Sequence, residues 1–204
     1  MSSETDVVNV ALRLVGAKTI VSLTDGSDNA SVVEDIYTET RDDLLSSHPW
    51  NFAIKRVQLA RISTAPAFEF DYAYALPSDW LRTVSVHDND AGHGTVLYRS
   101  EQVTGQKALV SSSDSVYLRY VSMVTDTNLM PPDFRRALAL SLARDLSIPL
   151  ASSNTMYEQF TRESARALTR ARSSDGMGSF PELRPRGSWA SSRAGFKRDD
   201  FLSD

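Results

Sequence analysis

Residues 41–53 read RDDLLSSHPWNFA, and this stretch decides the fold. Its first half completes a helical pattern of apolar residues, and Pro49 then pushes the residue before it out of helical geometry. Beyond Trp50 the apolar spacing changes from the helical period to the alternation of a strand. The stretch therefore marks a boundary between a helical region and a sheet region.

Two helices are predicted before this boundary. Ser3 and Asp6 have the spacing of a capping box, which predicts a helix over residues 5–15. Residues 25–29 are turn-forming and offer an N-cap, so a second helix is predicted over residues 28–46.

The region over residues 50–130 has the period-two pattern of strands. Large apolar residues alternate with smaller or charged ones over residues 68–76 and again over residues 116–121. Polar loops at residues 87–94 and 111–115 separate the predicted strands. We therefore expect a mostly antiparallel sheet region.

Two further helices are predicted after the sheet. The third begins at Pro131-Pro132-Asp133, because proline is tolerated in the first turn, and ends before Pro149. The fourth is predicted over residues 154–172. Glycines, prolines and serines interrupt any period from residue 174 onward, so residues 174–204 are predicted to be an extended tail.

The order of these elements predicts an α+β fold, because helices and strands do not alternate. We expect a four-helix bundle-like unit made of residues 1–49 and 131–173. A β-rich insertion of residues 50–130 separates its halves, and an extended C-terminal tail of residues 174–204 follows. Truncation after Ser174 is expected to leave the body folded, because the tail joins no periodic segment.

The composition is that of an ordinary globular protein, with 41% hydrophobic and 24% charged residues. The chain has no cysteine, which excludes disulfides, cysteine nucleophiles and thiolate metal sites. The formal net charge of −4 argues against a protein whose main task is to bind phosphates. No apolar run is long enough to span a bilayer, so no membrane partner is expected.

Carboxylates on the second predicted helix leave three interpretations open. Together they form what we call the acidic stripe: Asp35, Glu39, Asp42 and Asp43. Paired carboxylates can do acid–base work on a glycoside. They can equally form a solvated helix face, or contact a basic surface of a neighbouring copy.

Arginines at helical spacing on the fourth predicted helix form a basic stripe of Arg162, Arg166 and Arg170. They could contact DNA phosphates, or their stems could cover apolar surface. In an oligomer they could meet the acidic stripe of a neighbour.

Aromatic residues alternate along the predicted strand at Phe68, Phe70, Tyr72 and Tyr74. Such a row can stack on a sugar, but strict alternation favours the buried face of a sheet. Residues 87–93 read HDNDAGH, which offers oxygens and imidazoles for a cation but matches no defined site. An ordinary hairpin loop is the other interpretation, and we expect neither a metal nor a cofactor.

Ordered segments of the chain resemble the head-to-tail adaptor proteins of short-tailed bacteriophages, the tail tubular protein A family. The segments that carry the resemblance are ALRLVGA (11–17), RDDLLSSHPWNFA (41–53), YAYALPSD (72–79) with Leu81-Arg82, and Tyr120-Val121 followed by Pro132-Asp133-Phe134. Together with the alanine-rich third helix they extend the resemblance over residues 11–170.

The resemblance implies a virion structural protein of the connector, assembled in the host cytoplasm. Adaptors of this family form a ring, typically dodecameric, beneath the portal protein. They join the portal to the tail nozzle protein, and the double-stranded DNA genome leaves through their channel. The net negative charge suits a channel wall that should not hold DNA tightly.

The tail matches the family only at Ser188-Trp189 and Arg193. We expect Trp189, Phe196 and Phe201 to act as apolar anchors, with Arg193 as a polar clamp, on the portal or an adjacent subunit. Aromatic and arginine side chains usually dominate such interfaces.

An enzyme is the alternative, most plausibly a cell-wall hydrolase of the tail that uses carboxylates such as Glu34 or Glu39. No nucleophile or metal set accompanies these carboxylates in the sequence. We therefore expect that the protein is not an enzyme.

Overall fold

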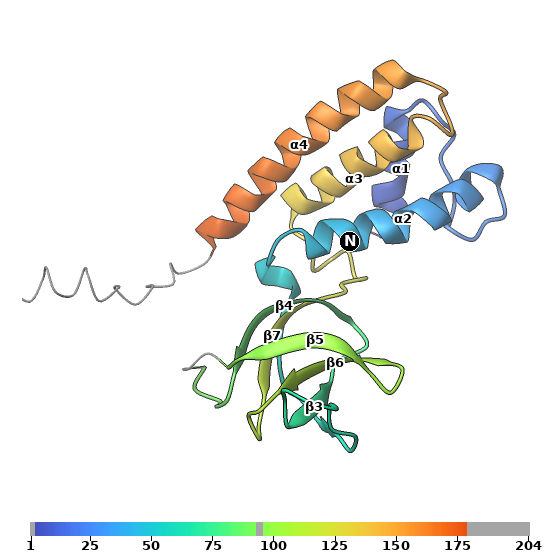
Figure 1. Cartoon of the computed structure of the whole chain (residues 1–204). Helices are drawn as coiled ribbons and strands as arrows, with labels where there is room; N and C mark the ends of the chain where they lie inside the picture. Colours follow the sequence, from blue (N-terminus) through green and yellow to red (C-terminus); the bar gives the residue numbers. More distant parts are fainter. Residues whose placement is uncertain (1–2, 93–95, 179–204) are drawn as a thin grey trace, which may run out of the picture.

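Helix α3 (Pro132–Leu146) is the central element of the helical body and packs against all three other helices (Figure 1). These are α1 (Glu4–Leu14), α2 (Asp28–Ser46) and α4 (Asn154–Met177). Alanines and leucines of α3 are buried on several sides, which lets neighbouring helices approach it closely. The computed structural model describes residues 3–92 and 96–178.

The first helix begins where the capping-box spacing predicts. The Ser3 hydroxyl accepts a hydrogen bond from the Asp6 amide at 3.1 Å, and the Asp6 carboxylate accepts one from the Ser3 amide at 2.8 Å. Gly16, with a φ of +77°, turns the chain after the helix. In α2 the Ser27 hydroxyl caps the Ala30 amide at 3.3 Å.

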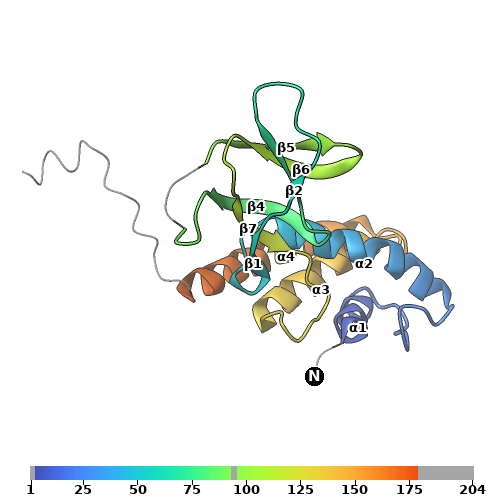
Figure 2. The ribbon, with the colours of Figure 1, turned by 90° about the horizontal axis from the view of Figure 1, so that it is seen from below.

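The β region consists of two antiparallel sheets (Figures 1 and 2). One has the strand order β1-β7-β4 and the other β2-β3-β6-β5. The strands are β1 (Ile54–Gln58), β2 (Arg61–Ile62), β3 (Tyr72–Ala75), β4 (Trp80–His87), β5 (Tyr98–Val103), β6 (Gln106–Ser111) and β7 (Tyr117–Ser122). The α+β fold with an antiparallel β region is thereby confirmed.

The three-stranded sheet lies between the helical body and the second sheet (Figure 1). Its strand β7 contributes buried residues to the cores on both of its faces. Val121 packs in the same cluster as the helices, whereas Leu118 and Tyr120 pack with Leu109 of the second sheet. The molecule therefore has three layers, in the order helical body, three-stranded sheet and four-stranded sheet.

The aromatic row before β3 is only partly buried. Phe70 and Tyr74 are buried, but Phe68 is 81% exposed. Glu69, with a φ of +73°, breaks the extended backbone between Phe68 and Phe70, and the strand begins only at Tyr72. The expectation that the whole row shares one buried face is therefore wrong for Phe68, which is exposed, and for Phe70, which packs with Ala73 and Val110 and not with Tyr74.

The boundary predicted at Pro49 is a short connection that holds Trp50 in the core. After α2, the chain makes a single turn of 3-10 helix, η1 (Asn51–Ala53), and enters β1. Trp50 is 1% exposed, and its indole N–H donates to the Leu44 carbonyl at 2.9 Å. Its ring meets Phe134 of α3 edge to face, with centroids 5.0 Å apart. One side chain thus joins the end of α2, the start of the β region and α3.

Substitution of this residue tests its role. Trp50→Ala should lower the free energy of unfolding by about 3–5 kcal/mol, because it opens a large cavity in the core. Urea unfolding followed by circular dichroism measures the loss. Trp80→Ala, at a half-buried position, is the control and should cost clearly less. Equal costs for the two variants would contradict this role.

Candidate interaction surfaces

The acidic stripe lies on α2, on the side of the helix that faces solvent. Asp35, Glu39 and Asp43 are exposed. Asp42 is half-buried, and its carboxylate accepts a hydrogen bond from the Arg41 side chain at 2.9 Å. Asp35 and Glu39 are therefore the members most open to a partner.

Arg41 itself is buried and belongs to the structure of the body. It is 4% exposed, lies 3.6 Å from the Glu4 carboxylate of α1, and sits over the Tyr37 ring. Burial, together with the Glu4 charge, raises the pKa of the Tyr37 hydroxyl above its usual range. This cluster connects α1 to α2, and Arg41 pairs with Asp42 but not with Asp35 or Glu39.

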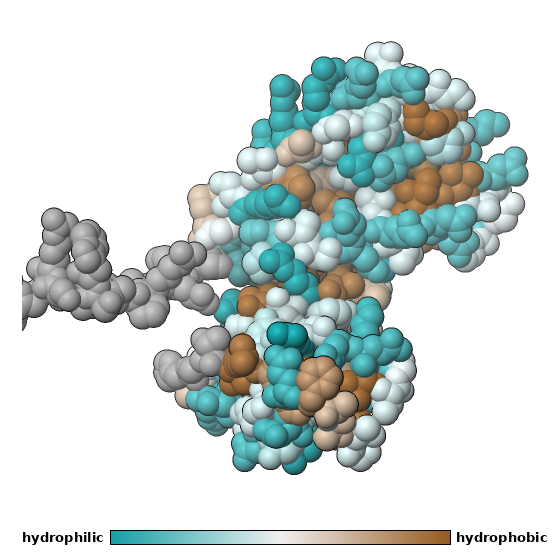
Figure 3. All heavy atoms as spheres, viewed as in Figure 1, coloured by the Kyte–Doolittle hydropathy of each residue, from teal (hydrophilic) through white to brown (hydrophobic). Residues whose placement is uncertain are grey.

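The basic stripe lies on α4, and all three of its arginines are exposed. Within residues 3–92 and 96–178, no ion pair joins Arg162, Arg166 or Arg170 to a carboxylate. Hydrophilic residues cover most of α4, whereas hydrophobic residues gather over α1 and α3 and near the boundary with the β region (Figure 3). The stripe is therefore a charged surface.

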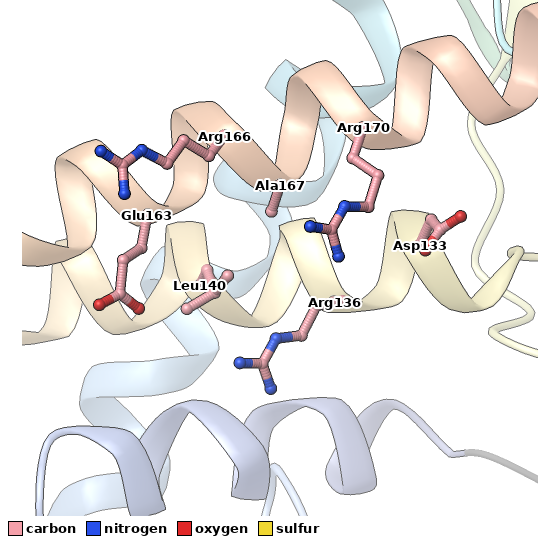
Figure 4. A pocket seen from close by; sticks show the side chains of 7 residues that line it. All are labelled: Asp133, Arg136, Leu140, Glu163, Arg166, Ala167 and Arg170. Carbon is pink, nitrogen blue, oxygen red and sulfur yellow. The ribbon is translucent and has the colours of Figure 1, made fainter.

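A cavity of about 210 Å³ lies where the basic stripe meets α3 (Figure 4). It is lined by Asp133, Arg136, Leu140, Glu163, Arg166, Ala167 and Arg170. The Arg170 side chain extends from α4 toward α3, whereas Arg166 extends along α4. Three guanidinium groups and two carboxylates give this surface a net positive charge.

Arg136 was missed in the sequence, although a signal for it exists. It stands four residues before Leu140, so both start from one face of α3, although the Arg136 side chain extends toward α1 in Figure 4. The apolar pattern of this helix predicts burial, so the pair Arg135-Arg136 within it was not singled out as part of a charged surface.

The two stripes lie on opposite sides of the body. Helix α3 lies between α4 and α2 in Figure 1, and these two helices meet only near their C-terminal ends, where Arg172 contacts Ser47. No ion pair connects the stripes in the part of the chain that the structure describes. Each molecule thus carries an acidic surface on one side and a basic surface on the other.

The last turn of α4 is fastened to the Trp50 connection. The Asp175 carboxylate accepts a hydrogen bond from the Asn51 amide at 3.0 Å, and the Asp175 carbonyl accepts one from the Asn51 side chain at 2.7 Å. We call these two hydrogen bonds the Asp175 clasp. Beside it, the Arg172 guanidinium donates to the Ser47 hydroxyl at 3.1 Å. The clasp explains why α4 continues to Met177, whereas we expected it to end near Arg172.

His48 lies beside the clasp. Its Nε2 atom is 3.5 Å from the Asp175 carboxylate, and its ring meets Trp50 edge to face. Burial lowers the pKa of His48 below its usual range, and the Asp175 charge opposes this shift without overcoming it.

An apolar pocket of about 250 Å³ opens next to the clasp. Its walls include Trp50, Phe52, Pro131, Phe134 and Ala171, and Asp175 lies on its rim with Gly178. Phe52 and Phe134 meet edge to face, with centroids 4.9 Å apart. The described chain ends at this pocket, because Gly178 is its last residue.

The remaining candidates give no assembled site. Trp189, Arg193, Phe196 and Phe201 lie outside the described residues, as does His93. Glu34 and Glu39 are exposed on α2, and neither lines the cavities described above. Over residues 3–92 and 96–178, no group of three or more acidic or histidine side chains could hold a metal ion. In the same part of the chain, no helix has the length and apolar character needed to cross a membrane.

Two comparisons with known proteins found no match. No protein-family model matches the chain, and no curated protein matches it.

Two truncated chains test the clasp. Truncation after Ser174 removes Asp175, whereas truncation after Gly178 keeps it. The shorter chain should be less stable by about 1–3 kcal/mol, because hydrogen bonds to a charged group are lost and the Asn51 amide loses its acceptor. Urea unfolding of both chains measures the difference. Equal stabilities would show that the clasp contributes nothing, and Asp175→Ala in the full chain provides the matched check.

The pH dependence of stability tests the environment of His48. Because the pKa is lowered in the folded state, the unfolded chain takes up a proton near pH 6.5 that the folded chain does not. The free energy of unfolding should therefore fall as the pH drops through this range. His48→Gln should show a shallower fall, measured by urea unfolding at a series of pH values. Identical slopes for the two proteins would contradict the lowered pKa.

Proposed function

We propose that the protein is a virion structural protein that forms a ring between the portal and the tail nozzle of a short-tailed bacteriophage. The resemblance over residues 11–170 supports this proposal. Its most specific segment, HPWNFA at residues 48–53, forms the connection that joins the helical body to the β region. A segment in that position fixes the architecture that the ring copies share.

The arrangement of charge is the observation that carries the proposal. An acidic surface on α2 and a basic surface on α4 lie on opposite sides of α3, and neither is neutralised by the other within one chain. A contact between unlike surfaces of successive copies is head-to-tail, and it closes into a ring when the rotation between copies allows. In such a ring, Arg166 and Arg170 of one copy face Asp35 and Glu39 of the next.

These ion pairs set the order of assembly. An exposed ion pair contributes about 0–1 kcal/mol, so a few of them do not hold a ring in dilute solution. They favour the correct register and speed the encounter of copies instead. We therefore propose that the ring closes on the portal, which gathers the copies, and that high salt weakens this step.

The other parts of the molecule have roles that follow from this arrangement. The tail would dock on the portal or a neighbour through Trp189, Arg193, Phe196 and Phe201. The ring would enclose the path of the double-stranded DNA, and a net charge of −4 per chain would keep the wall from holding phosphates. No catalytic step is required of any residue.

Charge reversal tests the head-to-tail contact. Arg166→Glu with Arg170→Glu should reduce ring formation on portal rings about tenfold or more, because it places carboxylates against carboxylates. Asp35→Lys with Glu39→Lys should have the same effect. The chain carrying all four substitutions should recover ring formation, since both surfaces are then reversed. Native mass spectrometry of the assembled complexes counts the copies.

A control pair keeps the change in net charge but places it elsewhere. Arg56→Glu with Arg99→Glu alters exposed residues of the β region and should leave ring formation unchanged. If the stripe variants assemble as well as this control, or the fourfold variant fails to recover, the two stripes do not contact each other.

A further inference from the structure

The apolar pocket beside the Asp175 clasp lies where the tail begins. Its walls carry three aromatic rings, of Trp50, Phe52 and Phe134, and its rim includes Gly178. Trp50 and Phe134 are almost fully buried, whereas Phe52 is half-buried. Phe52 therefore supplies most of the aromatic surface that the pocket leaves open, with Trp50 and Phe134 behind it, and the chain continues from Gly178 in the pocket lining.

We propose that Phe180 of the same chain occupies this pocket. It is the first large apolar residue after Gly178 and stands only two positions further along. Two residues span at most about 7 Å, so its Cα atom cannot lie far from the rim. Its ring then reaches the aromatic walls, where edge-to-face contacts with other rings are favourable.

The cost of ordering Phe180 is low for two reasons. The Asp175 clasp already fixes the end of α4, so only a very short segment remains to be closed. Pro181 follows directly and restricts Phe180 to extended backbone conformations even in the unfolded chain. The more distant apolar residues of the tail, such as Phe196 and Phe201, have neither advantage.

The consequence is a fixed starting point for the tail. With Phe180 in the pocket, residues beyond Pro181 leave the molecule next to the Trp50 connection. Trp189, Phe196 and Phe201 then remain available for contacts outside the chain. This inference goes beyond the proposed ring and does not depend on it, because it concerns a single copy in solution.

Thermal unfolding of the full chain gives the first test. Phe180→Ala should lower the Tm by roughly 2–8 °C, because an aromatic side chain leaves an apolar site. Phe180→Leu should recover part of this loss, and Phe196→Ala is the control that should leave the Tm unchanged. A Tm for Phe180→Ala equal to that of the control would overturn the proposal.

Fluorine NMR of fluorinated tryptophan gives the second test, because Trp50 lines the pocket. The chain has three tryptophans, and Trp80→Phe and Trp189→Phe assign their signals. Phe180→Ala should shift the Trp50 signal, and Phe196→Ala should not. Equal Trp50 signals in these two variants would overturn the proposal.

Dilution separates the chain's own tail from that of another copy. An occupant from the same chain should keep the Trp50 signal in place as the protein is diluted. A signal that moves on dilution toward its position in Phe180→Ala would mean that a second copy supplies the tail, which also overturns the proposal.

Discussion

The burial of Trp50 is the interaction on which the rest of the structure depends. Its indole N–H and the Ser47 hydroxyl both donate to the Leu44 carbonyl at the end of α2, where the helix itself leaves carbonyl groups unpaired. Its ring packs against Phe134 and so positions α3, the helix that all the others contact. The next residue, Asn51, holds the last turn of α4 through Asp175. The connection around Trp50 therefore fixes the positions of α2 and α4, and with them the positions of the charges on these helices.

Local signals made much of the fold predictable from the sequence. The Ser3 cap, the stop at Pro49 and the change of apolar period at Trp50 each act over a few residues, and each is present in the structure. Contacts between distant residues were not predictable in the same way. Asp175 and Asn51 are 124 positions apart, and nothing near Asp175 marks its partner. Phe68 followed the alternation of a strand, but a single positive φ at Glu69 ended that pattern.

For the candidate surfaces too, local features were predictable from the sequence, whereas features that depend on the packing of distant segments were not. Helical spacing alone placed the arginines of α4 and the carboxylates of α2 on solvent-facing sides. It did not show that α3 separates them or that Arg136 joins the basic side, because both depend on how the helices pack. The division between opposite sides is what turns two ordinary charged faces into a pair suited to a head-to-tail contact. Weak exposed ion pairs supply register in such a contact, so a larger partner must supply most of the affinity.

The most direct measurement is native mass spectrometry of the purified chain mixed with rings of the portal protein that the proposed function pairs it with. A head-to-tail adaptor should bind to saturation with as many copies as the portal ring has subunits. It should form no comparable ring when the portal is left out. The absence of binding to a portal shown to be intact would contradict the adaptor function, as would a saturating number of copies unrelated to the symmetry of the portal.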